Sequence, residues 1–277
     1  MADDLLTAPR NGATDETDTP KGRVEIDDVV IRFKGRHGPV TALSRTSHVL
    51  EPGTFTALIG PSGCGKSTLM NAIAGFVTPS EGSLRLDGRP IAGPSPEVGV
   101  IFQQYALFPW FTALDNVRYG LKQFGLPRRE EIDRARAALA EVGLEAHADK
   151  YPQQLSGGMK QRVAIARTFA VGPKVLLLDE PFGALDAQTR LVMHELLLNI
   201  WRKHRATVLF VTHDVDEALL LSDHVQVMSQ APGRLIRHYH LTQQRPRAFS
   251  RSGSDLLEIR DEILELLHPK TDLADSL

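Results

Sequence analysis

The sequence contains, at positions 60–67, the stretch Gly60-Pro61-Ser62-Gly63-Cys64-Gly65-Lys66-Ser67, which fits the pattern G-x-x-x-x-G-K-[ST] at every fixed position. An apolar run of strand length, residues 55–59, precedes it, and residues 68–74 read as a helix. The glycines let backbone N–H groups point inward at phosphate oxygens, and the helix adds the positive end of its dipole. We therefore predict a phosphate-binding loop in which Lys66 pairs with the β- and γ-phosphates and the Ser67 hydroxyl holds Mg²⁺. The predicted nucleotide-contacting set is Gly60, Pro61, Ser62, Gly63, Cys64, Gly65, Lys66, Ser67 and Thr68.

Composition points to a cytoplasmic globular protein. Of the 277 residues, 42% are hydrophobic and 24% charged, and the net charge of −2 gives no basic field for nucleic acid. No apolar run approaches the roughly 20 residues that cross a bilayer. Cys64 is the single cysteine, so an intrachain disulfide and a multi-cysteine metal site are excluded.

The thiol of Cys64 has two open interpretations. Its place near a helix N-terminus and Lys66 favours a reactive thiolate that nucleotide would protect. The alternative is a buried, inert thiol.

Both ends of the chain differ from its middle. Residues 1–22 are acidic and polar, lack the features of a signal peptide and read as a disordered tail. Residues 242–277 form a C-terminal tail in which residues 255–268 predict an amphipathic helix. Its apolar face comprises Leu256, Ile259, Ile263 and Leu267. This helix packs either on its own domain or on a partner subunit.

Residues 23–241 read as one α/β domain with an inserted helical part. The expected strands are residues 24–33, 41–50, 55–59, 83–86, 98–102, 175–178, 207–212 and 225–229. The expected helices, besides the one after the phosphate loop, are residues 128–142, 157–170, 190–203 and 215–221. The helical subdomain spans about residues 104–172 and interrupts the α/β core.

Two carboxylates follow the apolar strand at residues 175–178. Such a strand end beside a phosphate loop holds Mg²⁺, directly or through water, and this role fits Asp179. Glu180 is then placed to polarise the attacking water. Together with the loop, this pair indicates nucleoside triphosphate hydrolysis.

The segment Leu155-Ser156-Gly157-Gly158-Met159-Lys160-Gln161 resembles the signature of ATP-binding-cassette (ABC) ATPases, and the order of the other motifs agrees over residues 24–240. Ser156 is an N-cap candidate, and Gly157 and Gly158 leave backbone N–H groups uncovered at a helix start. The resemblance implies that this second anion site faces the γ-phosphate held by the opposite protomer of a homodimer, around two MgATP. It implies a P-loop NTPase core with a mixed sheet, an N-terminal antiparallel β subdomain and the inserted signature subdomain.

Four further residues match the family pattern. By this resemblance, Gln103 senses Mg²⁺ and water and touches a membrane subunit, and Asp186 lies in a loop that crosses between protomers. His213 contacts the γ-phosphate, and Phe33 stacks on adenine. Gln103, Lys66, Glu180 and His213 thus form the expected catalytic set.

The arrangement resembles that of a separate bacterial importer subunit, because the chain has one phosphate loop, one signature, no membrane segment and no coiled coil. Its implied partners are integral-membrane permease subunits at the cytoplasmic face of the inner membrane and, indirectly, a periplasmic or lipid-anchored solute-binding protein. Residues 105–110 suit docking on the permease, local core packing being the alternative. Residues 108–117 and 228–234 resemble the nitrate, sulfonate and taurine uptake group. Two other functions stay open: a soluble cassette ATPase that drives macromolecular assembly, and a nucleotide-binding regulator without turnover.

Overall fold

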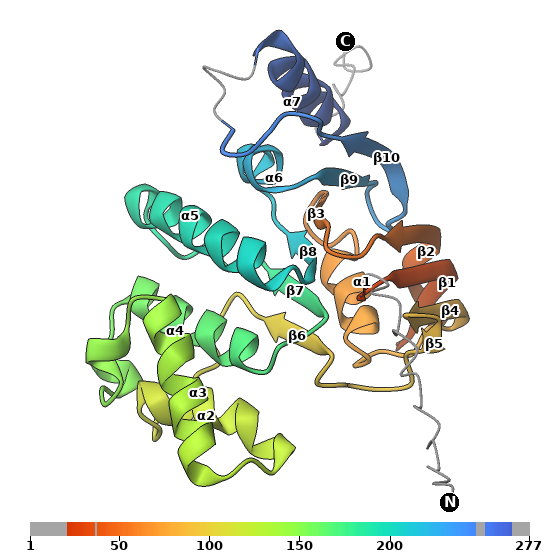
Figure 1. The fold of residues 1–277 in the computed structure, drawn as a ribbon. Coiled ribbons are helices and arrows are strands. Elements are labelled where there is room, and N and C mark those ends of the chain that lie inside the picture. Colours follow the sequence, from red (N-terminus) through yellow and green to blue (C-terminus); the bar gives the residue numbers. More distant parts are fainter. Residues whose placement is uncertain (1–20, 37, 248–252, 268–277) are drawn as a thin grey trace, which may run out of the picture.

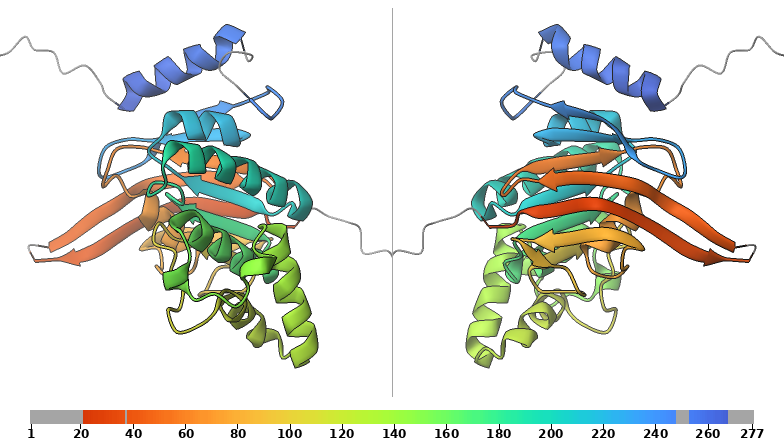
Figure 2. Two further views of the ribbon diagram at one scale, coloured as in Figure 1. Left: turned by 90° about the vertical axis from the view of Figure 1, so that its left-hand side faces the viewer. Right: turned by 90° about the vertical axis from the view of Figure 1, so that its right-hand side faces the viewer.

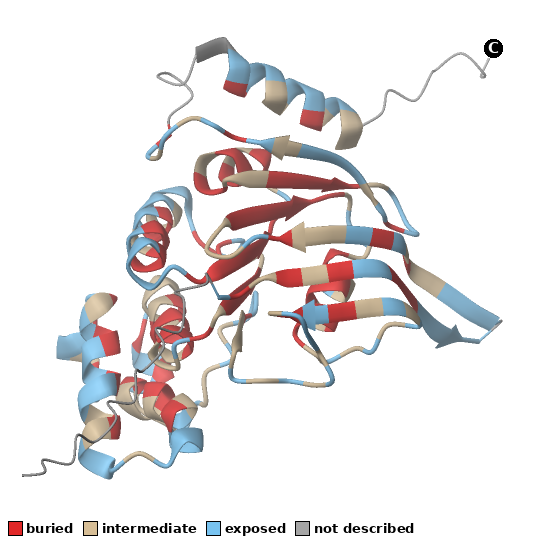
Figure 3. Ribbon diagram, turned by 45° about the vertical axis from the view of Figure 1, so that its right-hand side comes forward, coloured by how far each residue is buried: buried red, intermediate tan, exposed pale blue. Residues whose placement is uncertain are grey.

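The computed structural model describes residues 21–36, 38–247 and 253–267, and it has two sheets. The first sheet is antiparallel, with strand order β2-β1-β4-β5. Its strands are β1 (Val24–Gly35), β2 (Gly38–Leu50), β4 (Glu81–Leu86) and β5 (Arg89–Pro90). The β1–β2 hairpin projects from the body of the molecule, and its far end is exposed (Figures 2 and 3).

The second sheet has six strands in the order β10-β9-β3-β8-β7-β6. They are β3 (Phe55–Ile59), β6 (Val98–Ile101), β7 (Val175–Asp179), β8 (Thr207–Val211), β9 (His224–Met228) and β10 (Leu235–His240). Five strands run parallel, and β10 pairs antiparallel with β9, which makes the sheet mixed. Strands β3 and β8 are buried along their whole length, as expected for parallel strands covered on both faces.

Helices cover both faces of this sheet (Figure 1). The helices of the described residues are α1 (Lys66–Ile73), α2 (Ala113–Leu121), α3 (Arg128–Glu141), α4 (Gly157–Ala170), α5 (Ala187–His204), α6 (Val215–Leu221) and α7 (Gly253–Leu267), with short 3₁₀ turns at Lys122–Phe124, Glu145–His147 and Pro152–Gln154. Of these, α2 and α3 pack beside α4, away from the sheet (Figure 1). One apolar core holds α1 between the two sheets, and the other continues from the opposite face of the six-stranded sheet into α2–α7.

The predicted fold class is confirmed, and the differences lie in single elements. Helices α4 and α6 have the predicted bounds, whereas α5 begins three residues earlier because Asp186 caps it. Strand β10 and helix α2 were absent from the prediction.

The C-terminal segment packs on its own domain. The buried Arg247 guanidinium donates hydrogen bonds to four carbonyl oxygens, those of Leu219, Ser222, Leu241 and Gln243. The Arg245 guanidinium lies 4.3 Å from the ring centroid of the buried Trp201. On α7, Leu256 and Ile263 are fully buried against the core, and Ile259 and Leu267 are partly buried. Packing on the parent domain is therefore the interpretation of α7 that the structure supports.

The N-terminal tail falls almost wholly outside the described residues. Of residues 1–22, only Lys21 and Gly22 are described. The Gly22 backbone N–H donates to Asp87 Oδ1 at 2.7 Å, which holds this residue against the domain.

Candidate active site

The phosphate loop connects β3 to α1 and is closed around the ammonium group of Lys66. Lys66 is only 7% exposed, and its Nζ donates to the carbonyl oxygens of Gly60 at 2.8 Å and Pro61 at 3.0 Å. Gly65 begins α1 with a φ of 105°, and a Cβ added there would lie 2.6 Å from the carbonyl oxygen of Ala42. Only glycine fits this position, because it has both left-handed backbone and direct contact with β2.

The carboxyl end of β7 lies beside the loop. Ser67 Oγ donates to Asp179 Oδ1 at 3.3 Å. Burial raises the pKa of Asp179, and the charge of Glu180 raises it further, while the Ser67 hydrogen bond and Lys66 act in the opposite direction. Mg²⁺ binds to oxygen ligands, and in proteins it often takes only one or two from side chains while phosphates and waters supply the rest. The Ser67 hydroxyl and the Asp179 carboxylate are oxygen ligands of this kind and lie in contact. Across the described ranges no group of three or more His, Cys, Asp or Glu side chains is arranged for a metal ion. Ser67 and Asp179 therefore fit a metal ion that binds together with a phosphate ligand.

Glu180 has a strained backbone and meets His213. Its φ is 44°, a conformation that is held by its N–H donating to the carbonyl oxygen of Val211 at 2.9 Å. Its Oε2 lies 3.1 Å from Nδ1 of His213, whose side chain is largely exposed. The amide of Gln103 reaches the same place, since a Cβ added to Gly183 would lie 3.8 Å from both Gln103 Nε2 and Glu180 Oε2.

The signature residues lie elsewhere on the molecule. Ser156 caps α4, its hydroxyl accepting from the N–H of Met159 at 3.3 Å. Helices α1 and α4 occupy separate parts of the fold (Figure 1). Within the described residues, no hydrogen bond, ion pair or ring contact joins Ser156 or its two glycines to the phosphate loop. Within the described part of the chain, the phosphate loop and the signature residues therefore lie at two separate places.

Close packing is a second reason for the signature glycines. A Cβ added at Gly157 would lie 2.9 Å from Tyr105 Oη, and one at Gly158 would lie 2.9 Å from Thr189 Cγ2. Asp186 accepts hydrogen bonds from the N–H and the hydroxyl of the same Thr189, at 2.9 and 2.7 Å. The Asp186 loop and the signature are therefore neighbours.

Phe33 is exposed near the end of β1. It pairs with Val40, which is also exposed and lies two residues before the Ala42 that contacts Gly65. Its ring is available for stacking beside the loop.

The expectation of a reactive Cys64 does not fit the structure. The residue is 1% exposed, and a Cβ added at Gly60 would lie 2.8 Å from its sulfur. Its Sγ lies 4.0 Å from Lys66 Nζ, but the loop covers it. A reagent has no path to this thiol in the folded chain, so the inert alternative is supported.

The sequence analysis missed a cluster of charged groups behind His213. A small pocket there is lined by Glu180, Gly183, Arg190, Thr212, His213, Asp214 and Glu217. The available signal was Glu217, which follows Asp216 in the helix at residues 215–221 and, unlike Asp216, is buried.

Known proteins are similar to this chain in sequence and in fold. The family described as "ABC transporter" matches residues 43–183. A taurine import ATP-binding protein of Chromobacterium violaceum is 50% identical over 211 residues, covering 76% of this chain and 80% of that protein. A nitrate import ATP-binding protein of Synechocystis is 48% identical over 214 residues, covering 77% and 80%.

A solved dimeric ATP-binding cassette, described as a post-hydrolysis state bound to ADP and Pi, is similar in fold as well. It has a TM-score of 0.70 at 31% identity, and the match covers 80% of this chain and 100% of that one. The chain therefore belongs to the ABC transporter family, as one of its ATP-hydrolysing cassettes.

Proposed function

We propose that the chain is the ATP-hydrolysing subunit of a bacterial importer, forms a homodimer around two MgATP and drives a separate membrane permease. The taurine and nitrate relatives support a small solute of the nitrate, sulfonate or taurine class. Among the described helices none is long and apolar enough to cross a membrane. The chain then works as a peripheral subunit at the cytoplasmic face of the inner membrane, and a periplasmic or lipid-anchored binding protein delivers the solute. The names of the taurine and nitrate relatives favour this function over the assembly ATPase that the sequence left open.

The observation that carries the proposal is the split site. Lys66, Glu180 and His213 lie at one place, and Ser156 with its glycine N–H groups lies at another. A second copy turned to face the first brings each signature onto the other chain's γ-phosphate. Because that phosphate is shared, ATP holds the two copies together, and its hydrolysis releases them.

Within each completed site the residues have separate roles. Lys66 and the N–H groups of the loop stabilise charge on the phosphates. Ser67 and Asp179 hold Mg²⁺, which neutralises charge on the phosphate oxygens when it is bound. Glu180 takes a proton from the attacking water, and His213 orients Glu180 through the 3.1 Å contact. Gln103 places the water, and Phe33 stacks on adenine.

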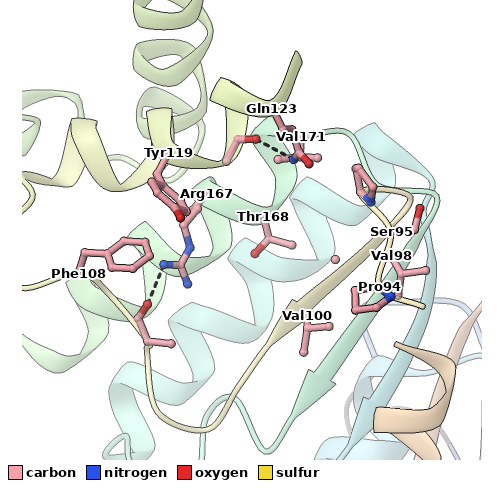
Figure 4. Close-up of a pocket in the computed structure, with 14 residues that line it drawn as sticks. Pro94, Ser95, Val98, Val100, Phe108, Tyr119, Gln123, Arg167, Thr168 and Val171 are labelled. Atoms are coloured by element: carbon pink, nitrogen blue, oxygen red, sulfur yellow. Dashed lines mark hydrogen bonds between the residues drawn. The ribbon is translucent and has the colours of Figure 1, made fainter. Parts of the chain in front are cut away.

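The permease docks at the pocket between β6, α2 and α4, with a volume of about 500 Å³. Phe108, Tyr119 and Arg167 form one side, and Pro94, Ser95 and Val98 form the other (Figure 4). We call Phe108, Trp110, Phe111 and Tyr119 the aromatic cluster, because their ring centroids lie 4.6 to 6.2 Å from one another where they pair. Trp110 is 67% exposed, which suits a surface that a partner covers.

Arg167 ties this surface to the segment after Gln103. Its guanidinium donates to the carbonyl oxygen of Ala106 at 2.7 Å and lies 6.0 Å from the Phe108 ring centroid. Displacement of the cluster by a permease is therefore passed toward Gln103, three residues before Ala106.

The test is Glu180→Gln, with Glu195→Gln on the exposed face of α5 as a matched control. The amide keeps the size of the side chain but cannot accept the proton. We expect MgATP binding to persist and turnover to fall roughly 10²-fold. Light scattering after gel filtration should show a dimer with ATP and a monomer with ADP, and adding Ser156→Arg should abolish the dimer. A Glu180→Gln chain that stays monomeric at saturating MgATP would contradict the shared site.

A further inference from the structure

We infer that Arg190 is a positioning residue that connects the loop containing Asp186 to the loop containing His213. This inference rests on the proposed homodimer and on the family resemblance, by which the Asp186 loop crosses between protomers and His213 contacts the γ-phosphate. Arg190 lies in the first turn of α5, and its N–H donates to the carbonyl oxygen of Asp186 at 2.9 Å. Its side chain reaches from there to the end of β8.

The Arg190 guanidinium has partners on both sides. Toward the first loop, Nη2 donates to the carbonyl oxygen of Leu185 at 3.1 Å. Toward the second loop, Nη1 lies 3.5 Å from Asp214 Oδ2, and Nε lies 3.8 Å from Glu217 Oε1. One planar group with fixed donor directions thus spans two loops that the sequence separates by more than 25 residues.

The His213 backbone is held on both sides, although its ring is largely exposed and contacts only Glu180 among the described hydrogen bonds. Thr212 is buried, and its hydroxyl donates to Glu217 Oε2 at 2.7 Å and accepts from the Asp214 N–H at 3.0 Å. Asp214 Oδ1 in turn accepts from the N–H groups of Asp216 and Glu217 at 2.9 and 3.1 Å. The position of His213 therefore follows the position of its two neighbours.

Glu217 anchors this network in the core. It is buried, and besides Thr212 it contacts Nε2 of the buried His194 at 3.0 Å. His194 packs against the Phe182 ring, at 5.2 Å between centroids, in the segment that follows Glu180. Thr212, Asp214 and Glu217 accordingly form a rigid base, and Arg190 connects that base to the loop at residues 184–186.

The contacts of Arg190 differ in length, so a movement of one loop can change its contacts with the other. The bond to Leu185 is of ordinary length, whereas the two toward Asp214 and Glu217 are long, and Nε has no hydrogen-bond partner in the described part of the chain. A shift of the loop by roughly 0.6 to 1 Å converts the contacts of 3.5 and 3.8 Å into normal charge-assisted hydrogen bonds of about 2.7–2.9 Å. Contact of the Asp186 loop with a partner protomer would thereby fix His213 and its contact with Glu180.

The experiment compares Arg190→Ala and Arg190→Lys with Arg202→Ala, an exposed arginine near the other end of α5. Displacement of His213 should lower kcat for ATP roughly 10- to 100-fold in Arg190→Ala. The KM for ATP and the Tm should change little. Arg190→Lys keeps the charge but loses the fork, so its kcat should fall between wild type and alanine. The lysine variant also serves if the alanine variant folds poorly. Arg202→Ala should retain wild-type kcat.

The deciding measurement is a double-mutant cycle with His213→Ala. If Arg190 acts through His213, Arg190→Ala should have no further effect on kcat in the His213→Ala background. Equal losses in both backgrounds, or wild-type kcat in Arg190→Ala, would overturn the inference. Wild-type kcat in His213→Ala alone would instead overturn the catalytic role of His213 in the proposed function.

Discussion

Asp179 combines two opposing demands in one side chain. To hold a cation it must be ionised, yet burial raises its pKa and the neighbouring Glu180 charge adds to the rise. The folded chain thus binds this proton more tightly than the unfolded chain, in which the pKa is near 3.8. When the pH is above the raised pKa of the folded chain, the ionised Asp179 carboxylate lowers the free energy of unfolding. This destabilisation is relieved as the pH falls below that pKa toward 3.8.

We therefore expect Asp179→Asn to raise the unfolding free energy of the nucleotide-free chain at neutral pH. The same substitution should remove Mg²⁺-dependent phosphate release. Urea unfolding and a phosphate assay measure the two effects.

The control for Asp179→Asn is Asp87→Asn. Burial raises the pKa of Asp87, but hydrogen bonds from Gly22, Lys174 and Arg23 outweigh it and lower the pKa overall. This substitution should therefore destabilise the fold. A loss of stability in Asp179→Asn would show that its carboxylate stabilises the fold.

Among the elements, α2 and the aromatic cluster before it present the most exposed large side chain, Trp110. We expect Trp110→Ala to leave basal hydrolysis by the isolated subunit unchanged and to weaken solute uptake in cells that contain the permease. The reason is that Trp110 lies outside the phosphate loop and beside the docking pocket. Phe76→Ala, which removes another exposed ring, after α1, is the matched control. Normal uptake, or equal loss of both activities, would reject docking at this surface.

Local sequence signals explain which elements could be predicted. Helices α4 and α6 start at Ser156 and Asp214, whose side chains cap them through neighbours two or three residues away. Thr112 and Asp115 form the same kind of capping pair at the start of α2, although the sequence analysis predicts no helix there. Strand β10 has mostly exposed side chains and depends on pairing with β9, so its own pattern is weak.

The candidate site likewise contains residues that a local sequence motif predicts and contacts that no local motif predicts. Lys66, Asp179 and Glu180 lie in or beside contiguous motifs and were predicted with their elements. The link from Arg190 to Asp214 and Glu217 requires two loops to fold together, and no short pattern contains it. The burial of Cys64 likewise depends on packing by Gly60 and the residues around it.

At the scale of the whole molecule, a cluster of histidines lies where β2 of one sheet meets β9 and β10 of the other. Gln226 on β9 contacts the His48 ring on β2, and His238 Nε2 lies 3.1 Å from His224 Nδ1. The pKa of His48 is lowered to about 4, chiefly by burial and also by the charges of His238 and His224, while the charge of Glu51 acts in the opposite direction. Burial likewise lowers the pKa values of His224 and His238.

Acidification should therefore loosen the junction between the sheets. With an unfolded value of 6.5 and a folded value of about 4 for His48, the unfolded chain binds more protons between those limits, so stability falls as the pH drops through them. We expect the unfolding free energy to decrease by about 1–2 kcal/mol between about pH 7 and pH 5, where carboxylates remain ionised. Urea unfolding across this range measures it. His48→Gln should flatten the slope and His147→Gln, outside the cluster, should not; a pH-independent wild type would contradict the expectation.

The two tryptophans of the chain occupy opposite environments, and this gives the molecule a built-in optical readout. Trp201 is enclosed between Phe55 and the Arg245 guanidinium, whereas Trp110 stands in solvent at the docking pocket. Emission that a water-soluble quencher removes comes from Trp110, and the shielded blue-shifted remainder comes from Trp201. Native fluorescence therefore separates occupation of the docking surface from the integrity of the core, with no label attached to either.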